Sequence, residues 1–219
     1  MKKTVILSVL VILLTPPLFT QEIDSTKKVF EYKSMKDDFR TLFGHDRPAG
    51  HYGAFTIGYS VIDNKQAIIF GGKFEWIVDH WIGFGVGGEG FINEYHYDVN
   101  LQRDVFLTGG YGGFIIEPIV FPKFPVHISF PSLFGVGGIS FISKEPEFYH
   151  NIIEDSEVFL IAEPSAELEF NITRNFRLAL GVSYKFTTPF NVGISAATPV
   201  KSDAIENWSY KMTFKFGRF

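Results

Sequence analysis

From residue 51 to residue 216 the sequence alternates between apolar and other side chains, and this period of two constrains the fold more than any other feature. Successive side chains of a strand point to opposite faces, so the alternation predicts strands with two different faces. Eight strands are expected, at residues 53–62, 67–77, 81–93, 105–121, 126–143, 158–172, 177–189 and 208–216. No helical segment separates them, which excludes a parallel α/β fold.

The connections between these segments fall into two groups by length. Those at 78–80, 122–125 and 173–176 are short, whereas those at 94–104, 144–157 and 190–207 are long and polar, and only 63–66 is brief in the second group. Short turns at one end and long loops at the other indicate an up-and-down arrangement. An even number of strands lets the sheet close, and each strand is long enough to cross a bilayer at a tilt. The predicted fold is all-β: an eight-stranded antiparallel up-and-down transmembrane β-barrel.

Formal charges within the strands support this arrangement, because each lies on the same face of its strand as any other charge there. The opposite face is an apolar band without a charge, which suits contact with lipid. The charged face is rich in glycine and alanine, as a narrow filled lumen requires. We therefore predict a plugged lumen with a nearly balanced charge network, in which Lys211 and Lys215 meet interior glutamates such as Glu75. Its members are Lys73, Glu75, Glu89, Glu117, Glu163, Glu167, Glu169, Arg177, Lys185, Lys211 and Lys215.

Three prolines lie inside the predicted strands, at Pro118, Pro131 and Pro164. Proline has no N–H for the ladder, and a closed barrel has no edge where a missing donor is harmless. The prolines are therefore expected to mark bulges, each of which would shift the inside and outside assignment beyond it by one residue.

The N-terminal part of the chain is predicted to differ from the rest. Residues 1–20 have the pattern of a secretory signal peptide, with two lysines followed by a short apolar run. Residues 21–50 are predicted to be a periplasmic segment, either a short amphipathic helix or a loose lead-in, and residues 51–219 the barrel. The net charge of −4 gives no basic surface for a phosphate backbone, so we expect no nucleic-acid partner. With no cysteine, the exported chain has no disulfide framework.

The turn and strand "NITRNFRLALGVSYKF" and the final "YKMTFKFGRF" resemble those of small outer-membrane β-barrel proteins of Gram-negative bacteria, similar to the transmembrane domain of outer-membrane protein A. The resemblance implies a place in the bacterial outer membrane and partners in outer-membrane lipid and lipopolysaccharide. It also implies that the barrel assembly machinery reads the last strand, and we expect a monomer. The corresponding assembly signal is Tyr210, Met212, Phe214, Phe216 and Phe219, although "GR" at 217–218 moves Phe219 off the face that carries Phe214 and Phe216.

One pair of residues suggests chemistry. His127 and Ser129 are similar to the His-x-Ser pair of outer-membrane lipid A deacylases, in which a histidine base activates a serine nucleophile. Here the pair lies beside a short turn, at the periplasmic end, whereas lipid A acyl bonds lie in the other leaflet. The alternative is a lumen histidine bonded to Glu117 or Glu163, and we expect no catalysis.

No cofactor or metal is predicted. Residues 83–88 contain G-x-G-x-x-G, but no helix follows, so these glycines, like those of "GGYGG" at 109–113, are interpreted as relief of crowding in the barrel wall. The long loops carry His96, His150, Glu145, Glu147, Glu154, Asp155 and Glu157, none at metal-ligand spacing.

The sequence thus predicts a non-enzymatic outer-membrane barrel with a plugged lumen and a structural or surface-interaction role through its long loops. A first alternative is a lipid-modifying barrel enzyme of the acyl-hydrolase kind. A second is a soluble, lipocalin-like ligand binder, in which the apolar face would turn inward.

Overall fold

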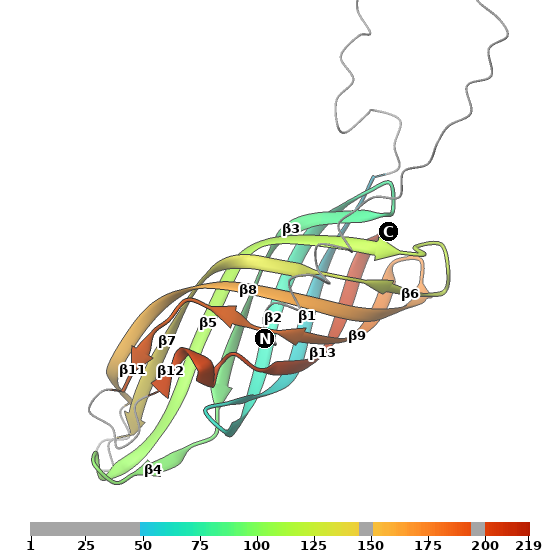
Figure 1. The fold of residues 1–219 in the computed structure, drawn as a ribbon. Helices are drawn as coiled ribbons and strands as arrows, with labels where there is room; N and C mark the ends of the chain where they lie inside the picture. The colour runs from blue at the N-terminus through green and yellow to red at the C-terminus, as the bar shows by residue number, and fades with distance from the viewer. Residues whose placement is uncertain (1–48, 145–150, 194–199) are drawn as a thin grey trace, which may run out of the picture. The chain divides into compact units, whose positions relative to one another are not determined.

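The computed structural model describes residues 49–144, 151–193 and 200–219, which form an antiparallel sheet closed into a ring (Figure 1). The ring contains β1 (Ala49–Ile62), β2 (Lys65–Val78), β3 (Ile82–Asn93), β5 (Arg103–Val120), β6 (Val126–Ser129), β7 (Ser132–Lys144), β8 (Asn151–Thr173), β9 (Phe176–Tyr184), β10 (Phe186–Thr187) and β13 (Trp208–Arg218). Outside the ring, β4 (His96–Asp98) pairs with β5. The segment before β13 holds β11 (Asn191–Val192), β12 (Val200–Lys201) and the short 3-10 helix η1 (Ser202–Ala204).

The ring closes because β1 pairs with β2 on one side and with β13 on the other. It has eight positions, since β6 with β7, and β9 with β10, are each one strand interrupted once. Phe55 lies opposite Phe214 and Tyr59 opposite Tyr210, so the last strand closes the ring against the first. The predicted eight-stranded antiparallel barrel is confirmed. Strand limits lie within four residues of the predicted ones, except that β8 begins at Asn151 instead of residue 158.

The two ends of the barrel differ as the connection lengths predict. We call the end with the turns at 79–81, 121–125 and 174–175 the short-turn end, and the end with β4, β11 and β12 the long-loop end. β1 begins at Ala49 and β13 ends at Arg218, and both of these strand ends lie at the short-turn end. The predicted signal peptide and the segment up to residue 48 lie outside the described residues. Among the described residues, no helix is long and apolar enough to cross a membrane.

The barrel wall has an apolar outer face and a charged inner face. Large apolar side chains are exposed around the ring, among them Phe55, Ile57, Ile68, Phe70, Trp76, Val86, Phe114, Phe134, Leu160, Leu180 and Phe216. All members of the predicted charge network lie on the inner face, where they are buried or nearly so. A soluble ligand-binding barrel would have the reverse arrangement, so this alternative is wrong.

The prolines do not produce the predicted bulges. β5 keeps one register with both β6 and β7, and β8 keeps one register with β6 and with β7 as far as Phe141. Neither face therefore shifts at Pro118, Pro131 or Pro164. Phe130 N donates to Pro118 O at 2.9 Å, and Ser165 N donates to Pro131 O at 2.8 Å. Pro118 and Pro131 accept these bonds through their carbonyl oxygens, but a proline has no N–H to donate to the neighbouring strand. The wall therefore loses single hydrogen bonds without inserting a residue.

Register shifts lie elsewhere, between Phe141 and Ile142 in β7 and between Asn171 and Thr173 in β8. These positions are close to the two ends of β8, beyond the part of the wall that carries the interior charges. The face assignment made from the sequence consequently holds through the middle of every strand.

An apolar cluster fills the lumen toward the long-loop end. It contains Ile69, Phe91, Leu107, Tyr111, Ile139, Phe141, Phe159 and Ile161 from the wall, with Phe190, Val192, Val200 and Ile205 from the segment between β10 and β13. The rings of Phe159 and Phe190 are 5.2 Å apart. Asp63 N donates to Ala204 O at 3.0 Å, which fastens this segment to the turn between β1 and β2. The predicted polar loop is thus partly a plug.

Replacing Phe159 by alanine is expected to lower the free energy of unfolding by roughly 3–5 kcal/mol, because it leaves a cavity beneath the plug. Urea unfolding in detergent micelles measures this change. Val158 is the matched control because it is the neighbouring residue and is exposed on the outer face. Val158→Ala should change stability by no more than about 0.5 kcal/mol, and equal losses for the two variants would contradict the proposed packing.

Candidate functional site

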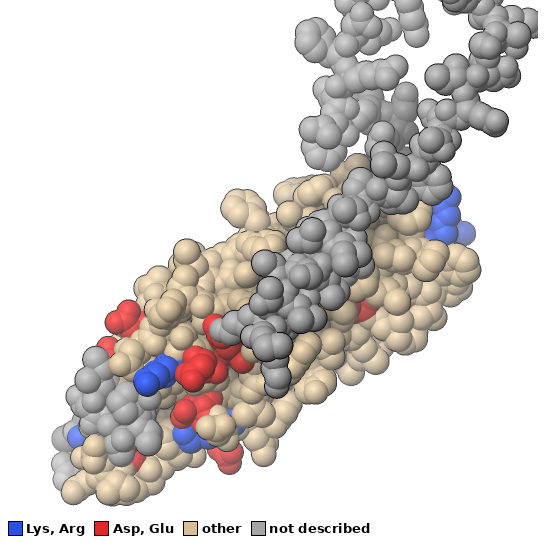
Figure 2. Space-filling model, in the orientation of Figure 1, with Lys and Arg blue, Asp and Glu red and all other residues tan. Residues whose placement is uncertain are grey.

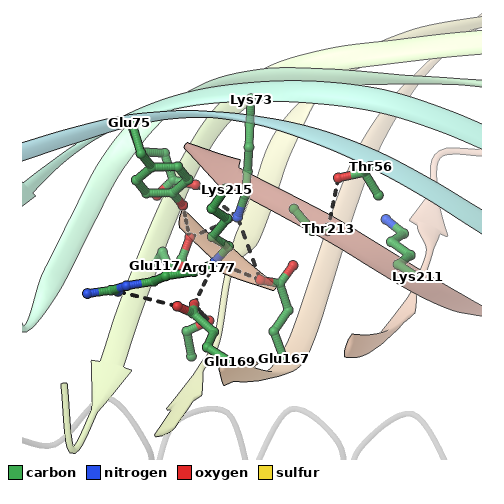
Figure 3. Close-up of polar contacts among 12 residues, drawn as sticks. Thr56, Lys73, Glu75, Glu117, Glu167, Glu169, Arg177, Lys211, Thr213 and Lys215 are labelled. Atoms are coloured by element: carbon green, nitrogen blue, oxygen red, sulfur yellow. Dashed lines mark hydrogen bonds and ion pairs between the residues drawn. The ribbon is translucent and has the colours of Figure 1, made fainter. Parts of the chain in front are cut away.

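The main chemical feature of the barrel is a network of charged side chains across its lumen (Figure 3). Its members come from β2, β3, β5, β8, β9 and β13, together with Lys185, which lies between β9 and β10. Each strand contributes through its inner face, so alternate residues converge on a space too narrow for bulk water.

Lys215 is the centre of one half of the network. Its Nζ lies 2.6 Å from Glu117 Oε1, 2.8 Å from Glu167 Oε2 and 2.6 Å from Glu169 Oε1. Lys215 is 1% exposed, so these three carboxylates replace the water that its ammonium would bind. Figure 3 shows the side chain reaching from β13 toward β5 and β8.

Lys73 and Tyr52 complete this half. Lys73 Nζ lies 2.8 Å from Glu117 Oε2 and 3.1 Å from Glu75 Oε1, and Tyr52 donates to Glu117 Oε2 at 2.5 Å. The Tyr52 ring also lies near both ammonium groups, 5.7 Å from Lys73 Nζ and 5.3 Å from Lys215 Nζ. Glu117 is therefore bonded through both oxygens.

Lys211 is the centre of the other half. Its Nζ lies 2.5 Å from Glu89 Oε1 and 2.7 Å from Glu163 Oε1. The Tyr111 hydroxyl lies within hydrogen-bond distance of both carboxylates, 2.7 Å from Glu89 Oε2 and 2.9 Å from Glu163 Oε2, so its one proton is donated to either of them. Ser183 adds a bond of 2.7 Å to Glu163 Oε1. Lys185, buried above this group, donates to Ser209.

Glu75 differs from the other glutamates. It is fully buried, and neither of its oxygens has a hydrogen-bond donor among the described residues. Lys211 and Lys215 do meet interior glutamates, as predicted, but Glu75 is not one of them, because Lys73 is its ionic contact. The period of two fixes which face a side chain occupies, but the stagger of the strands decides which residues meet across the lumen.

His127 and Ser129 both contact the carboxylate of Glu169. Ser129 Oγ donates to Glu169 Oε1 at 2.6 Å, and His127 Nε2 lies 3.1 Å from Glu169 Oε2. Both side chains thus bind the same carboxylate, which itself pairs with Lys215, and no contact joins the serine to the histidine. The predicted partner of His127, Glu117 or Glu163, is wrong, since Glu169 takes that place. The buried hydroxyl serves here to hold a carboxylate.

Three carboxylates come close enough together to hold a metal ion. Oxygens of Glu117, Glu167 and Glu169 lie within 4.8 Å of one another. The Lys215 ammonium contacts all three, so the space between them already holds a cation of the protein. Of the predicted loop residues, Glu145, Glu147 and His150 lie outside the described residues, as does the side chain of Glu154. Asp155 accepts a bond from Gly193 N at 3.0 Å.

The glycines of the sequence motifs lie in barrel strands, in β3 and β5. A Cβ on Gly85 would be 2.0 Å from Phe74 O, and one on Gly113 would be 2.6 Å from Gly135 Cα. These close approaches have no phosphate-binding turn or following helix, and they account for the glycines by crowding alone.

Residues of the predicted assembly signal occupy two faces. Tyr210, Met212 and Phe216 are exposed on the outer face, and Phe214 is half-buried there. Phe219 turns inward, with its ring 5.5 Å from that of Tyr52 and 3.9 Å from the Arg177 guanidinium. The change of face between 216 and 219 was visible in the sequence, but its inward contacts were not.

Solved structures with a similar fold are small outer-membrane barrels. A major outer membrane protein of Thermus thermophilus has a TM-score of 0.52 and 13% identity, covering 78% of this chain and 99% of that one. Neisserial surface protein A has a TM-score of 0.47 and 9% identity, with coverage of 78% and 96%. The attachment invasion locus protein of Yersinia pestis, Ail, in complex with the heparin analogue sucrose octasulfate, has a TM-score of 0.43 and 13% identity, with coverage of 77% and 96%. No protein-family model matches the sequence, and no curated protein is significantly similar to it.

At this level of identity the similarity shows the fold alone, and the Thermus structure carries it. The chain is a barrel of the outer-membrane type, and its charge-free outer face is suited to hydrocarbon. Apart from the positions opposite the three prolines, the closed barrel pairs its backbone groups internally, and the bacterial outer membrane is where barrels of this kind reside.

Replacing Lys215 by methionine is expected to cost roughly 3–5 kcal/mol of unfolding free energy, because three buried carboxylates lose their shared cation. Urea unfolding in detergent measures the loss. Adding Glu167→Gln to Lys215→Met should recover part of it by removing one uncompensated charge. Lys123→Met, on an exposed turn residue, is the control and should change little. A Lys215→Met barrel as stable as the native one would contradict the network.

Proposed function

We propose that this protein is a non-enzymatic outer-membrane barrel with a closed lumen, whose long-loop end projects from the cell and makes surface interactions. The observation that carries the proposal is the exposure of apolar side chains beyond the ring at that end. Tyr97 and Val99, in and after β4, are 60% and 71% exposed, and Tyr95 before β4 is exposed as well. Lipid accounts for apolar side chains on the barrel wall, but these lie outside the wall and mark a contact surface.

The closed lumen is supported by the two kinds of filling described above. The ion network fills the part around Lys215 and Lys211, and the apolar cluster fills the part toward the long-loop end. An eight-stranded barrel of this kind is filled by its own side chains. We therefore infer that the protein is not a pore, and that its activity lies in its surfaces.

The long-loop end is acidic. Among residues whose side chains the structure describes, seven carboxylates that are not buried outnumber three cations there: Asp63, Glu94, Asp104, Asp155, Glu157, Asp203 and Glu206 against Lys65, Arg103 and Lys201. Figure 2 shows acidic side chains gathering over the half of the visible face toward β4, β11 and β12. Burial, and then the charge of Lys65, lowers the pKa of His96, so this ring adds no positive charge at neutral pH. The surface therefore favours a basic partner with apolar side chains.

We further propose that the protein is a monomer surrounded by outer-membrane lipid and lipopolysaccharide, and that the barrel assembly machinery recognises the last strand. The closure of β13 on β1 supports a monomer, because it leaves no strand edge within the wall.

The proposed role predicts two measurements. Purified protein in planar bilayers should give no stable conductance steps, because the lumen is filled.

Cells carrying the barrel should be retained on a surface coated with a basic protein, cytochrome c, more than on one coated with acidic albumin. Replacing Tyr95, Tyr97 and Val99 together by serine should reduce that retention several-fold, whereas Asn100→Ala in the same hairpin should not. Unchanged retention by the triple variant would count against this surface.

The non-enzymatic proposal predicts that Ser129→Ala leaves lipid A acylation in cells unchanged, because the serine hydroxyl bonds to Glu169 and not to the histidine. Mass spectrometry of lipid A, at matched protein levels in the membrane, measures this. A change in acyl-chain number on loss of Ser129 would favour the acyl-hydrolase alternative.

A further inference from the structure

A basic hollow opens at the short-turn end of the barrel, between the turn from β8 to β9 and the end of β13. Its volume is about 590 Å³, and its lining includes Arg174, Arg177 and Arg218. The neutral side chains Asn171, Asn175 and Phe219 complete most of the wall, and no carboxylate side chain lines it. Three arginines among its lining residues give the hollow a preference for an anion.

The hollow is held in shape by hydrogen bonds between its two sides. Asn175 Nδ2 donates to Gly217 O at 2.9 Å, and Gly217 N donates to Asn175 O at 3.0 Å. These two bonds tie the turn that carries Arg174 to the strand end that carries Arg218. The two segments that carry these arginines are consequently held next to each other beside the hollow.

Arg177 forms the fixed part of the hollow. It is 7% exposed, lies 3.4 Å from Glu169 Oε2, and stacks on the Phe219 ring. Arg174 and Arg218 are exposed instead, and neither has an ion pair within the described residues. One guanidinium is therefore oriented in advance, and two remain available to an anion.

Asn171 adds a second chemical requirement. Its Nδ2 donates to Phe124 O at 3.0 Å, which fixes the amide, whereas its Oδ1 is buried and accepts no hydrogen bond among the described residues. An unsatisfied buried acceptor favours a ligand that brings a donor. A phosphate with an ammonium or hydroxyl group a few atoms away meets both requirements.

The hollow lies at the depth of lipid headgroups. Trp81, Phe121 and Phe124 are exposed around the short-turn end, and Phe176 stacks on Phe216 at 4.9 Å beside it. Aromatic side chains of outer-membrane barrels mark the two interfaces between hydrocarbon and headgroups. The arginines follow these aromatics at the strand ends, where the phosphates of a leaflet lie.

We propose that this hollow binds the headgroup of a phospholipid in the leaflet at the short-turn end, with its phosphate among the three arginines and its ammonium on Asn171 Oδ1. The inference goes beyond the proposed surface role, and it does not depend on what the long-loop end contacts. Bound lipid would anchor the barrel at the end opposite that surface.

The test uses full-length protein in a neutral detergent and short-chain phosphatidylethanolamine, with binding measured by native mass spectrometry. Replacing Arg174 and Arg218 together by glutamine should weaken binding by roughly tenfold or more. Lys123→Gln, on the neighbouring turn, should leave it unchanged. Equal affinity of the double variant and the native protein would overturn the site.

Two further arms identify the ligand. Inorganic phosphate should bind at least tenfold more weakly than the lipid, and equal affinity would replace the lipid by a free anion. The native protein should prefer phosphatidylethanolamine to phosphatidic acid, and Asn171→Leu should abolish that preference. No preference in the native protein would overturn the role given to Asn171.

Discussion

In hydrocarbon every backbone N–H and C=O must find a partner within the protein, and the pairing of β13 with β1 is the contact that meets this requirement. Once the ring is closed, each side chain must face either lipid or lumen, because alternate residues point to opposite sides. Charged side chains must then face the lumen. The ion network is therefore a consequence of closure, and its acids and bases compensate one another because water cannot reach them.

The sequence predicts the ring and its faces well because both depend on a period of two that runs through every strand. It predicts poorly the contacts across the lumen, because these depend on the offset between one strand and the next. Lys215 and Glu75 were expected to meet, yet Lys215 crosses to Glu117, Glu167 and Glu169. Faces are a local property of one strand, whereas partners across the lumen depend on the offsets of several strands together.

The plug shows a second limit. Phe190, Val192, Val200 and Ile205 lie in a segment with no regular alternation, and nothing local distinguishes these apolar residues from those of a solvated loop. Their burial depends on an apolar space that exists only after the wall has formed. The same limit applies to His127 and Ser129. Their spacing is that of a catalytic pair, but their contacts depend on Glu169, which lies on another strand.

The three prolines have a consequence for the hydrogen bonding of the wall. They lie at the same level on neighbouring strands, and each removes one donor from a ladder that has no solvent to replace it. The ladders of β5, β6 and β8 therefore have local gaps at this level, whereas neither β1 nor β13 contains a proline. Missing hydrogen bonds are thus concentrated on one side of the barrel, and the ladder that closes the ring between the first and last strands is free of them.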